Sequence, residues 1–222
     1  MSSRTESWGS EVVCDNRGMI FVRSKLAWLT VAVVAAIFGA WLARELHHSE
    51  PRLTSGTWFS QPRELADFAL TDQAGRPFTH ASLKGRPTLV FFGFTHCPDI
   101  CPTTLATLAQ VKKAAGVAAL RVVLISVDPQ RDTPPVLEKY VHAFAADFTG
   151  ATGNQESIDR LTKEFGVAVQ RVALPGGDHT MDHSAAVFLL DADGRIAAVF
   201  TPPFEVDAMA ADLRRAAPAL QS

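Results

Sequence analysis

Two cysteines carry the clearest chemical signal in this sequence. Cys97 and Cys101 are separated by three residues, and the chain's third cysteine is Cys14. Residues four apart lie on one face of a helix with their Cα atoms about 6 Å apart. That separation falls inside the range of roughly 4.4–6.8 Å that a disulfide requires. The pair can therefore close on each other or on one metal ion.

Two plainer interpretations of the pair stay open at this point. Free cysteines are often small core residues, so both could be structural. A zinc site normally takes four protein ligands from Cys and His, and the region that follows the first 25 residues holds only these two cysteines. Two neighbouring cysteines in an otherwise cysteine-free domain nevertheless favour chemistry over structural crosslinking.

The sequence around the cysteines predicts a buried strand, a turn and a helix. An apolar run from Thr88 to Phe94 precedes them. After them, apolar residues recur at three- and four-residue steps, namely Leu105, Leu108, Val111 and Ala115. The pair then lies at a helix N-terminus, where free N–H groups and the helix dipole stabilise a thiolate.

Further strands and helices alternate along the rest of the chain. We expect a β-hairpin at 68–78, strands at 120–127, 167–172, 185–190 and 195–200, and helices from Pro134, over 158–165 and over 205–216. Such alternation indicates an α/β sheet that helices cover on both faces.

Composition excludes some classes of function. The chain has 222 residues, a net charge of −2 and 47% hydrophobic residues. The balance of charge gives no sign of nucleic-acid binding, and the apolar content is sufficient for a well-packed core.

An apolar segment near the N-terminus predicts a membrane anchor. Residues 26–43 carry no charge, with Trp28 and Trp41 near the two ends as interface anchors. A cleaved signal peptide is disfavoured because the sequence from Ala43 is a poor cleavage site. A buried core helix is the remaining alternative. Basic residues before the span place the C-terminal domain in the periplasm, whether the chain starts at Met1 or at Met19.

These observations divide the chain into four parts. They are a cytoplasmic segment (1–25), a single-pass inner-membrane anchor (26–43), a linker (44–64) and a globular domain (65–219).

Three segments together resemble the Sco (SenC) family of copper chaperones. They are Phe92–Leu105 with both cysteines, Val127–Pro134, and the tripeptide Asp182-His183-Ser184. The resemblance covers roughly residues 60–217. It implies a thioredoxin-like α/β fold, here with an added N-terminal β-hairpin and one preceding transmembrane helix.

The resemblance also implies the site and its partner. Copper, as Cu(I) and also Cu(II), would be bound by Cys97, Cys101 and His183. The acceptor would be the subunit of cytochrome c oxidase that bears the CuA centre, or another copper acceptor. Two thiolates and one imidazole form a soft site that suits Cu(I). The same cysteines could instead act as a redox-active disulfide pair that reduces the cysteines of the CuA site.

Other polar residues near these motifs have open roles. Asp128 and Asp132 are expected to cap turns and to pair with Arg131, with a role behind the metal ligands as the alternative. Asp182 could orient His183 or simply face solvent, and His96 is a weaker candidate for a metal contact. His179 stands where the family often has an aromatic residue, and it is a possible extra ligand.

Three rival functions share parts of this pattern. A periplasmic thiol–disulfide oxidoreductase without a copper-delivery role usually has C-x-x-C, one residue shorter than the spacing here. A peroxiredoxin-like peroxidase has Thr three residues before its reactive cysteine, whereas Thr95 is two before Cys97. A copper store or sensor would have the same site and a different partner.

Overall fold

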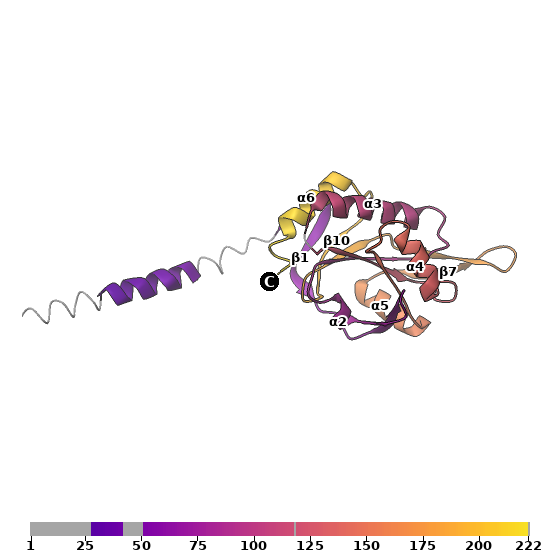
Figure 1. Cartoon of the computed structure of the whole chain (residues 1–222), viewed down its shortest axis with the longest axis horizontal. Coiled ribbons are helices and arrows are strands. Elements are labelled where there is room, and N and C mark those ends of the chain that lie inside the picture. Colours follow the sequence, from indigo (N-terminus) through magenta and orange to yellow (C-terminus); the bar gives the residue numbers. More distant parts are fainter. Residues whose placement is uncertain (1–27, 42–50, 118, 222) are drawn as a thin grey trace, which may run out of the picture. The chain divides into compact units, whose positions relative to one another are not determined.

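The computed structural model describes residues 28–41, 51–117 and 119–221 of the chain (Figure 1). The chain divides into two units, Met1–Ser49 and Glu50–Ser222. In the first unit, residues 28–41 form a helix whose side chains are all exposed.

The predicted membrane anchor is not confirmed by this helix. Across the described residues, no helix combines the length and the apolar character that crossing a membrane requires. The expected span at 26–43 extends past residues 28–41 at both ends, and its ends lie outside the described residues, as do the expected cytoplasmic segment 1–25 and residues 44–50 of the expected linker.

An eight-stranded mixed sheet forms the centre of the second unit. Its strand order is β1-β10-β9-β4-β5-β6-β2-β3. The bounds are β1 Gly56–Arg63, β2 Ala69–Asp72, β3 Pro77–Thr79, β4 Thr88–Gly93, β5 Arg121–Ser126, β6 Thr149–Thr152, β9 Val187–Leu190 and β10 Ile196–Phe200. Strands β4, β5 and β6 are parallel, and the remaining pairs are antiparallel. A separate two-stranded sheet pairs β7 (Val169–Ala173) with β8 (His179–His183).

Helices cover both faces of this sheet, as the sequence predicts. They are α2 His80–Leu83, α3 Ile100–Ala115, α4 Pro134–His142, α5 Gln155–Phe165 and α6 Val206–Ala216. In Figure 1, α3 and α6 lie on one side of the sheet and α2 and α5 on the other. Alternate residues of β4 point to the two faces: Phe92 packs edge-on against Phe165 of α5, whereas Gly93 lies against Cys101 of α3.

Most predicted elements are present, and the linker prediction needs correction. Gly56–Arg63, expected to belong to the linker, form β1, which pairs with β10. Trp58 and Phe59 pack against the core from this strand. The predicted hairpin at 68–78 is confirmed as β2 and β3. Strand β1 gives a weak signal in the sequence because it lies at the sheet edge. Its side chains are exposed or half-buried there, so many of them are polar.

Strand register brings two loops to one edge of the sheet. Every residue of β4 is buried, and Gly93 at its end is aligned with Ser126 at the end of the parallel strand β5. The loops that follow, 94–99 and 127–133, therefore leave the sheet side by side. The first carries Cys97, and the second carries Asp128 and Asp132.

Candidate metal centre

The structure brings Cys101 and His183 into contact from opposite parts of the chain. The Cys101 Sγ lies 3.4 Å from the His183 Nε2, although the two residues are 82 positions apart. The Cys101 backbone N–H donates to the Cys97 Sγ at 3.4 Å. Both cysteines are free thiols, Cys101 buried and Cys97 half-buried. All three predicted site residues are therefore neighbours.

The strand β4 fixes where the Cys101 sulfur lies. Cys101 stands in the first turn of α3 and is fully buried. A Cβ atom at Gly93 would lie 3.0 Å from the Cys101 Sγ. Only glycine at this position lets the helix start pack so closely on the end of the strand.

Backbone and ring contacts orient His183. Its Nδ1 lies 3.2 Å from the Ser184 carbonyl oxygen, so the Nδ1–H donates there and Nε2 faces Cys101 as an acceptor. The rings of Phe91 and Phe94 contact the imidazole edge-on. Burial lowers the pKa of His183 below its ordinary 6.5. The ring is thus held in the neutral form that binds metals.

Burial has the opposite effect on the thiol of Cys101. It raises the pKa of Cys101 far above the ordinary 9.0, and the neighbouring Cys97 adds to the rise. The expected stabilisation of a thiolate by the helix N-terminus is therefore outweighed at this position. Cys101 is a protonated thiol that donates to His183 until a metal or a disulfide replaces its proton.

The three donors do not form a closed coordination shell. Within the part of the chain that the structure describes, no group of three or more His, Cys, Asp or Glu side chains is arranged to hold a metal ion. A cavity of about 350 Å³, lined by Gln170, Asp182, His183 and three small or apolar neighbours, adjoins the imidazole.

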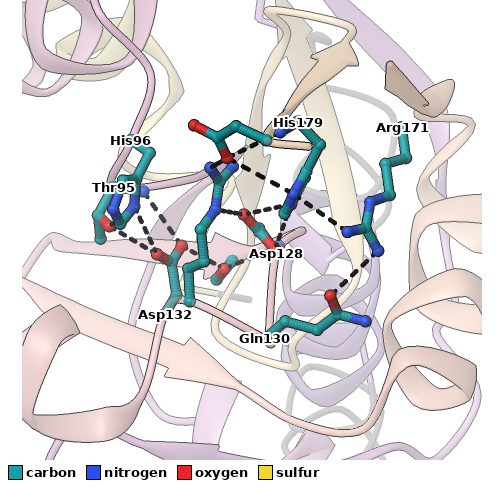
Figure 2. A network of polar contacts seen from close by, with 10 residues as sticks. Thr95, His96, Asp128, Gln130, Asp132, Arg171 and His179 are labelled. Carbon is teal, nitrogen blue, oxygen red and sulfur yellow. Dashed lines mark hydrogen bonds and ion pairs between the residues drawn. The ribbon is translucent and has the colours of Figure 1, made fainter. Parts of the chain in front are cut away.

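Asp132 holds the turn that precedes Cys97. It is fully buried and accepts hydrogen bonds from the Thr95 N–H at 3.1 Å, the Thr95 hydroxyl at 2.6 Å and the Ser126 hydroxyl at 2.6 Å (Figure 2). Asp132 therefore caps this turn, as expected, and it does not cap the helix α4, whose N-cap residue is Thr133. No local pattern in the sequence signals Thr95, 37 residues away, as the partner of Asp132.

Asp128 joins the same loop to the β7–β8 hairpin. It is 3% exposed and forms the expected ion pair with Arg131. The His179 Nε2 lies 3.2 Å from each Asp128 carboxylate oxygen (Figure 2). The imidazole of His179 is thus engaged with a carboxylate.

The two remaining candidates, His96 and Asp182, have different surroundings. The His96 Nδ1 lies 3.1 Å from the Thr95 hydroxyl and 3.9 Å from Asp132, so this ring belongs to the polar network (Figure 2). Asp182 is exposed, and the orienting partner of His183 is the Ser184 carbonyl.

Sequence comparison decides the family. The model of the SCO1/SenC family matches residues 59–218, which is most of the chain. The chain belongs to the SCO1/SenC family. Its eight-stranded sheet with helices on both faces is the thioredoxin-like Sco fold, as the resemblance implied.

Curated Sco relatives are similar over the same domain. The SCO2-like protein of Rickettsia felis is 41% identical over 133 residues, covering 58% of this chain and 65% of that protein. The mitochondrial SCO2 homologue of Bos taurus is 35% identical over 178 residues, covering 75% of this chain and 65% of that protein. The chain thus spans about two thirds of the length of these relatives.

Solved Sco structures share the fold and include copper-bound examples. Bradyrhizobium japonicum ScoI with copper bound has 42% identity and a TM-score of 0.62, covering 68% of this chain and 97% of that one. Yeast Sco1 with copper bound has 29% identity and a TM-score of 0.63, covering 68% and 87%. BsSco, for which a disulfide switch is described, has 26% identity and a TM-score of 0.59, covering 73% and 98%.

Proposed function

We propose that this Sco protein is a copper chaperone that binds copper through Cys97, Cys101 and His183. The observation that carries the proposal is the 3.4 Å contact between the Cys101 sulfur and the His183 Nε2, with the Cys97 sulfur on the Cys101 amide. Copper-bound structures of ScoI and yeast Sco1, which share this fold, support copper as the metal.

The donor set suits copper as a transferable cargo. Two thiolates and one neutral imidazole make a soft site of low coordination number, which favours Cu(I), and Cu(II) would be bound with a further ligand. His183 is already neutral, so it has no proton to lose when copper binds. The protons released on copper binding come from the thiols.

The acceptor in this proposal is the CuA-bearing subunit of cytochrome c oxidase or another copper-binding protein. BsSco is described as a member of the Sco family of cytochrome c oxidase assembly proteins, which supports this choice. The cavity beside His183 gives such a partner a route to the imidazole.

The proposed location is the inner membrane, with the domain in the periplasm. Residues 26–43 would span the bilayer once, residues 1–25 would be cytoplasmic, and the linker would extend from 44 only to the start of β1. A mitochondrial SCO2 homologue and a SCO1/SenC family lipoprotein among the similar proteins support a membrane-associated setting.

Thiol–disulfide exchange is the second candidate function. Cys97 is the more exposed thiol, and Cys101 lies buried next to it. A Cys97 thiolate would attack a partner disulfide and form a mixed disulfide. Cys101 would then attack the Cys97 sulfur, which oxidises this pair and leaves the partner with two thiols. The disulfide switch described for BsSco favours keeping this candidate.

An anaerobic Cu(I) titration of the reduced Glu50–Ser222 unit against a competing chelator tests the proposal. We expect tight one-to-one binding that both Cys97→Ser and His183→Ala weaken strongly. His142→Ala, which removes an exposed histidine at the end of α4, is the matched control and should bind as the wild type does. A Cu(I) affinity that is unchanged in both Cys97→Ser and His183→Ala would contradict copper delivery and favour thiol exchange.

A further inference from the structure

The β7–β8 hairpin, residues 169–183, carries His183 but has little apolar anchorage. Four of the five β7 residues are exposed, and Met181 is the one buried residue of β8. The hairpin also lies outside the eight-stranded sheet, and its turn projects from the domain (Figure 1). Something other than sheet pairing must hold its inner face against the site.

His179 supplies a polar attachment, and its partners define its protonation state. The Arg171 Nη2 lies 3.1 Å from the His179 Nδ1. A guanidinium can only donate, so this Nδ1 is the acceptor and carries no proton. The His179 Nε2–H is then free to donate to the Asp128 carboxylate, 3.2 Å from both oxygens. A neutral imidazole satisfies both contacts at once.

Further contacts join the hairpin to the loop after β5. The Arg131 Nη1 donates to Asp178 at 3.1 Å, and the Arg171 Nη1 donates to the Gln130 side-chain oxygen at 3.0 Å. Of the two hairpin side chains that form ion pairs with this loop, His179 is better buried than Asp178: 10% of the His179 side chain is exposed, against 67% for Asp178. Exposed ion pairs contribute little, so the His179–Asp128 contact is the principal polar attachment.

The same loop also holds the other half of the site. Asp132, four residues after Asp128, binds the backbone and hydroxyl of Thr95, two residues before Cys97. One short segment, 128–132, therefore contacts both the cysteine turn and the hairpin that carries His183 (Figure 2). It is a common support for segments that are far apart in sequence.

We infer that His179 is a positioning residue for His183, a role that rests on the proposed copper site. Alternate residues of a strand share a face, so 179, 181 and 183 of β8 all point toward the domain. A fixed contact at 179 holds this face down and keeps the His183 Nε2 directed at Cys101. Without it, the hairpin lifts about its connection to β9, and the imidazole loses its direction.

The test is a double-mutant cycle on Cu(I) affinity in the Glu50–Ser222 unit. His179→Leu should weaken Cu(I) binding about tenfold, at the lower end for residues that support metal ligands. His179→Gln should restore most of the affinity, because an amide offers both a donor and an acceptor. In a His183→Ala background, His179→Leu should change the affinity no further.

Each outcome distinguishes this inference from the proposed function. Unchanged affinity in His179→Leu, or an equal loss with and without His183, would overturn the positioning role and leave the copper site intact. Equal Cu(I) affinities in the wild type and in His183→Ala would instead overturn the proposed copper site, and the inference with it. Amide hydrogen exchange should accelerate across the β7–β8 hairpin in His179→Leu and remain slow in β4, which verifies that the domain still folds.

Discussion

Gly93 and Cys101 meet where the strand β4 ends and the helix α3 begins. A Cβ added at Gly93 would lie 3.0 Å from the Cys101 sulfur and 3.0 Å from the Phe91 ring. The buried strand therefore determines the depth at which this sulfur stands. That depth in turn sets the contact between Cys101 and His183 at 3.4 Å.

Gly93→Ala should damage both folding and copper binding. The added methyl must displace the Cys101 sulfur or the Phe91 ring, and such overpacking typically costs about 1–3 kcal/mol of unfolding free energy. Gly150→Ala on strand β6 is the matched control, because its Cβ would crowd Leu137 of α4 at 3.1 Å and not a cysteine. Denaturant unfolding should show losses for both variants, and Cu(I) competition a loss for Gly93→Ala alone. Equal Cu(I) affinities in the two variants would contradict this account.

Asp132→Asn should loosen the turn before Cys97. The buried carboxylate accepts three hydrogen bonds, two from Thr95 and one from Ser126, and an amide turned toward them cannot accept all three. Leaving a buried donor unpaired costs about 1–3 kcal/mol of unfolding free energy. Asp147→Asn removes an exposed partner of Lys112 and should cost less than about 1 kcal/mol. If urea unfolding shows the same loss of unfolding free energy for both substitutions, the contacts of Asp132 with Thr95 do not stabilise the domain.

The two thiols should react at very different rates. Cys97 is half-exposed, whereas Cys101 is buried and burial raises its pKa. Only the thiolate is nucleophilic, so iodoacetamide should modify Cys97 well before Cys101. Mass spectrometry of peptides from the Glu50–Ser222 unit measures both rates without interference from Cys14. Faster modification of Cys101 would show that the helix dipole, and not burial, controls this thiol.

Copper affinity should rise with pH. The raised pKa of Cys101 keeps its proton on throughout the neutral range, so binding must release it. Release of one proton makes the apparent Cu(I) affinity increase about tenfold per pH unit. The pKa of His183 is lowered, so above pH 6.5 the imidazole is already neutral and adds no proton release of its own. Competition titrations between about pH 6.5 and 8, corrected for the chelator's own protonation, should show this slope; a flat profile would contradict it.

Much of the fold is predictable because its elements have strong local patterns. The uninterrupted apolar run of β4 and the helical spacing of Leu105, Leu108 and Val111 both report burial directly. Strand β1 and the hairpin strand β8 lack such a pattern, because each places few side chains in the core and leaves the others exposed or half-buried. Edge strands of this kind carry a weak sequence signal.

The site is predictable in part for a different reason. The cysteine spacing and the tripeptide at His183 resemble a known family, and the structure brings Cys101 and His183 together. The supporting contacts depend on tertiary structure: Thr95 and Asp132 are 37 residues apart, and Asp128 and His179 are 51 apart. No local pattern signals such pairs. The direction of the Cys101 pKa shift likewise depends on burial that only the folded chain reveals.

The most direct test of the three-ligand copper site is X-ray absorption spectroscopy of the Cu(I)-loaded domain, for the wild type and for His183→Ala. The account predicts two sulfur ligands from Cys97 and Cys101 and one imidazole nitrogen in the wild type, with the imidazole scattering lost in the variant. Identical spectra for the two proteins, with sulfur ligands alone, would contradict the assignment of His183 and the copper site built on it.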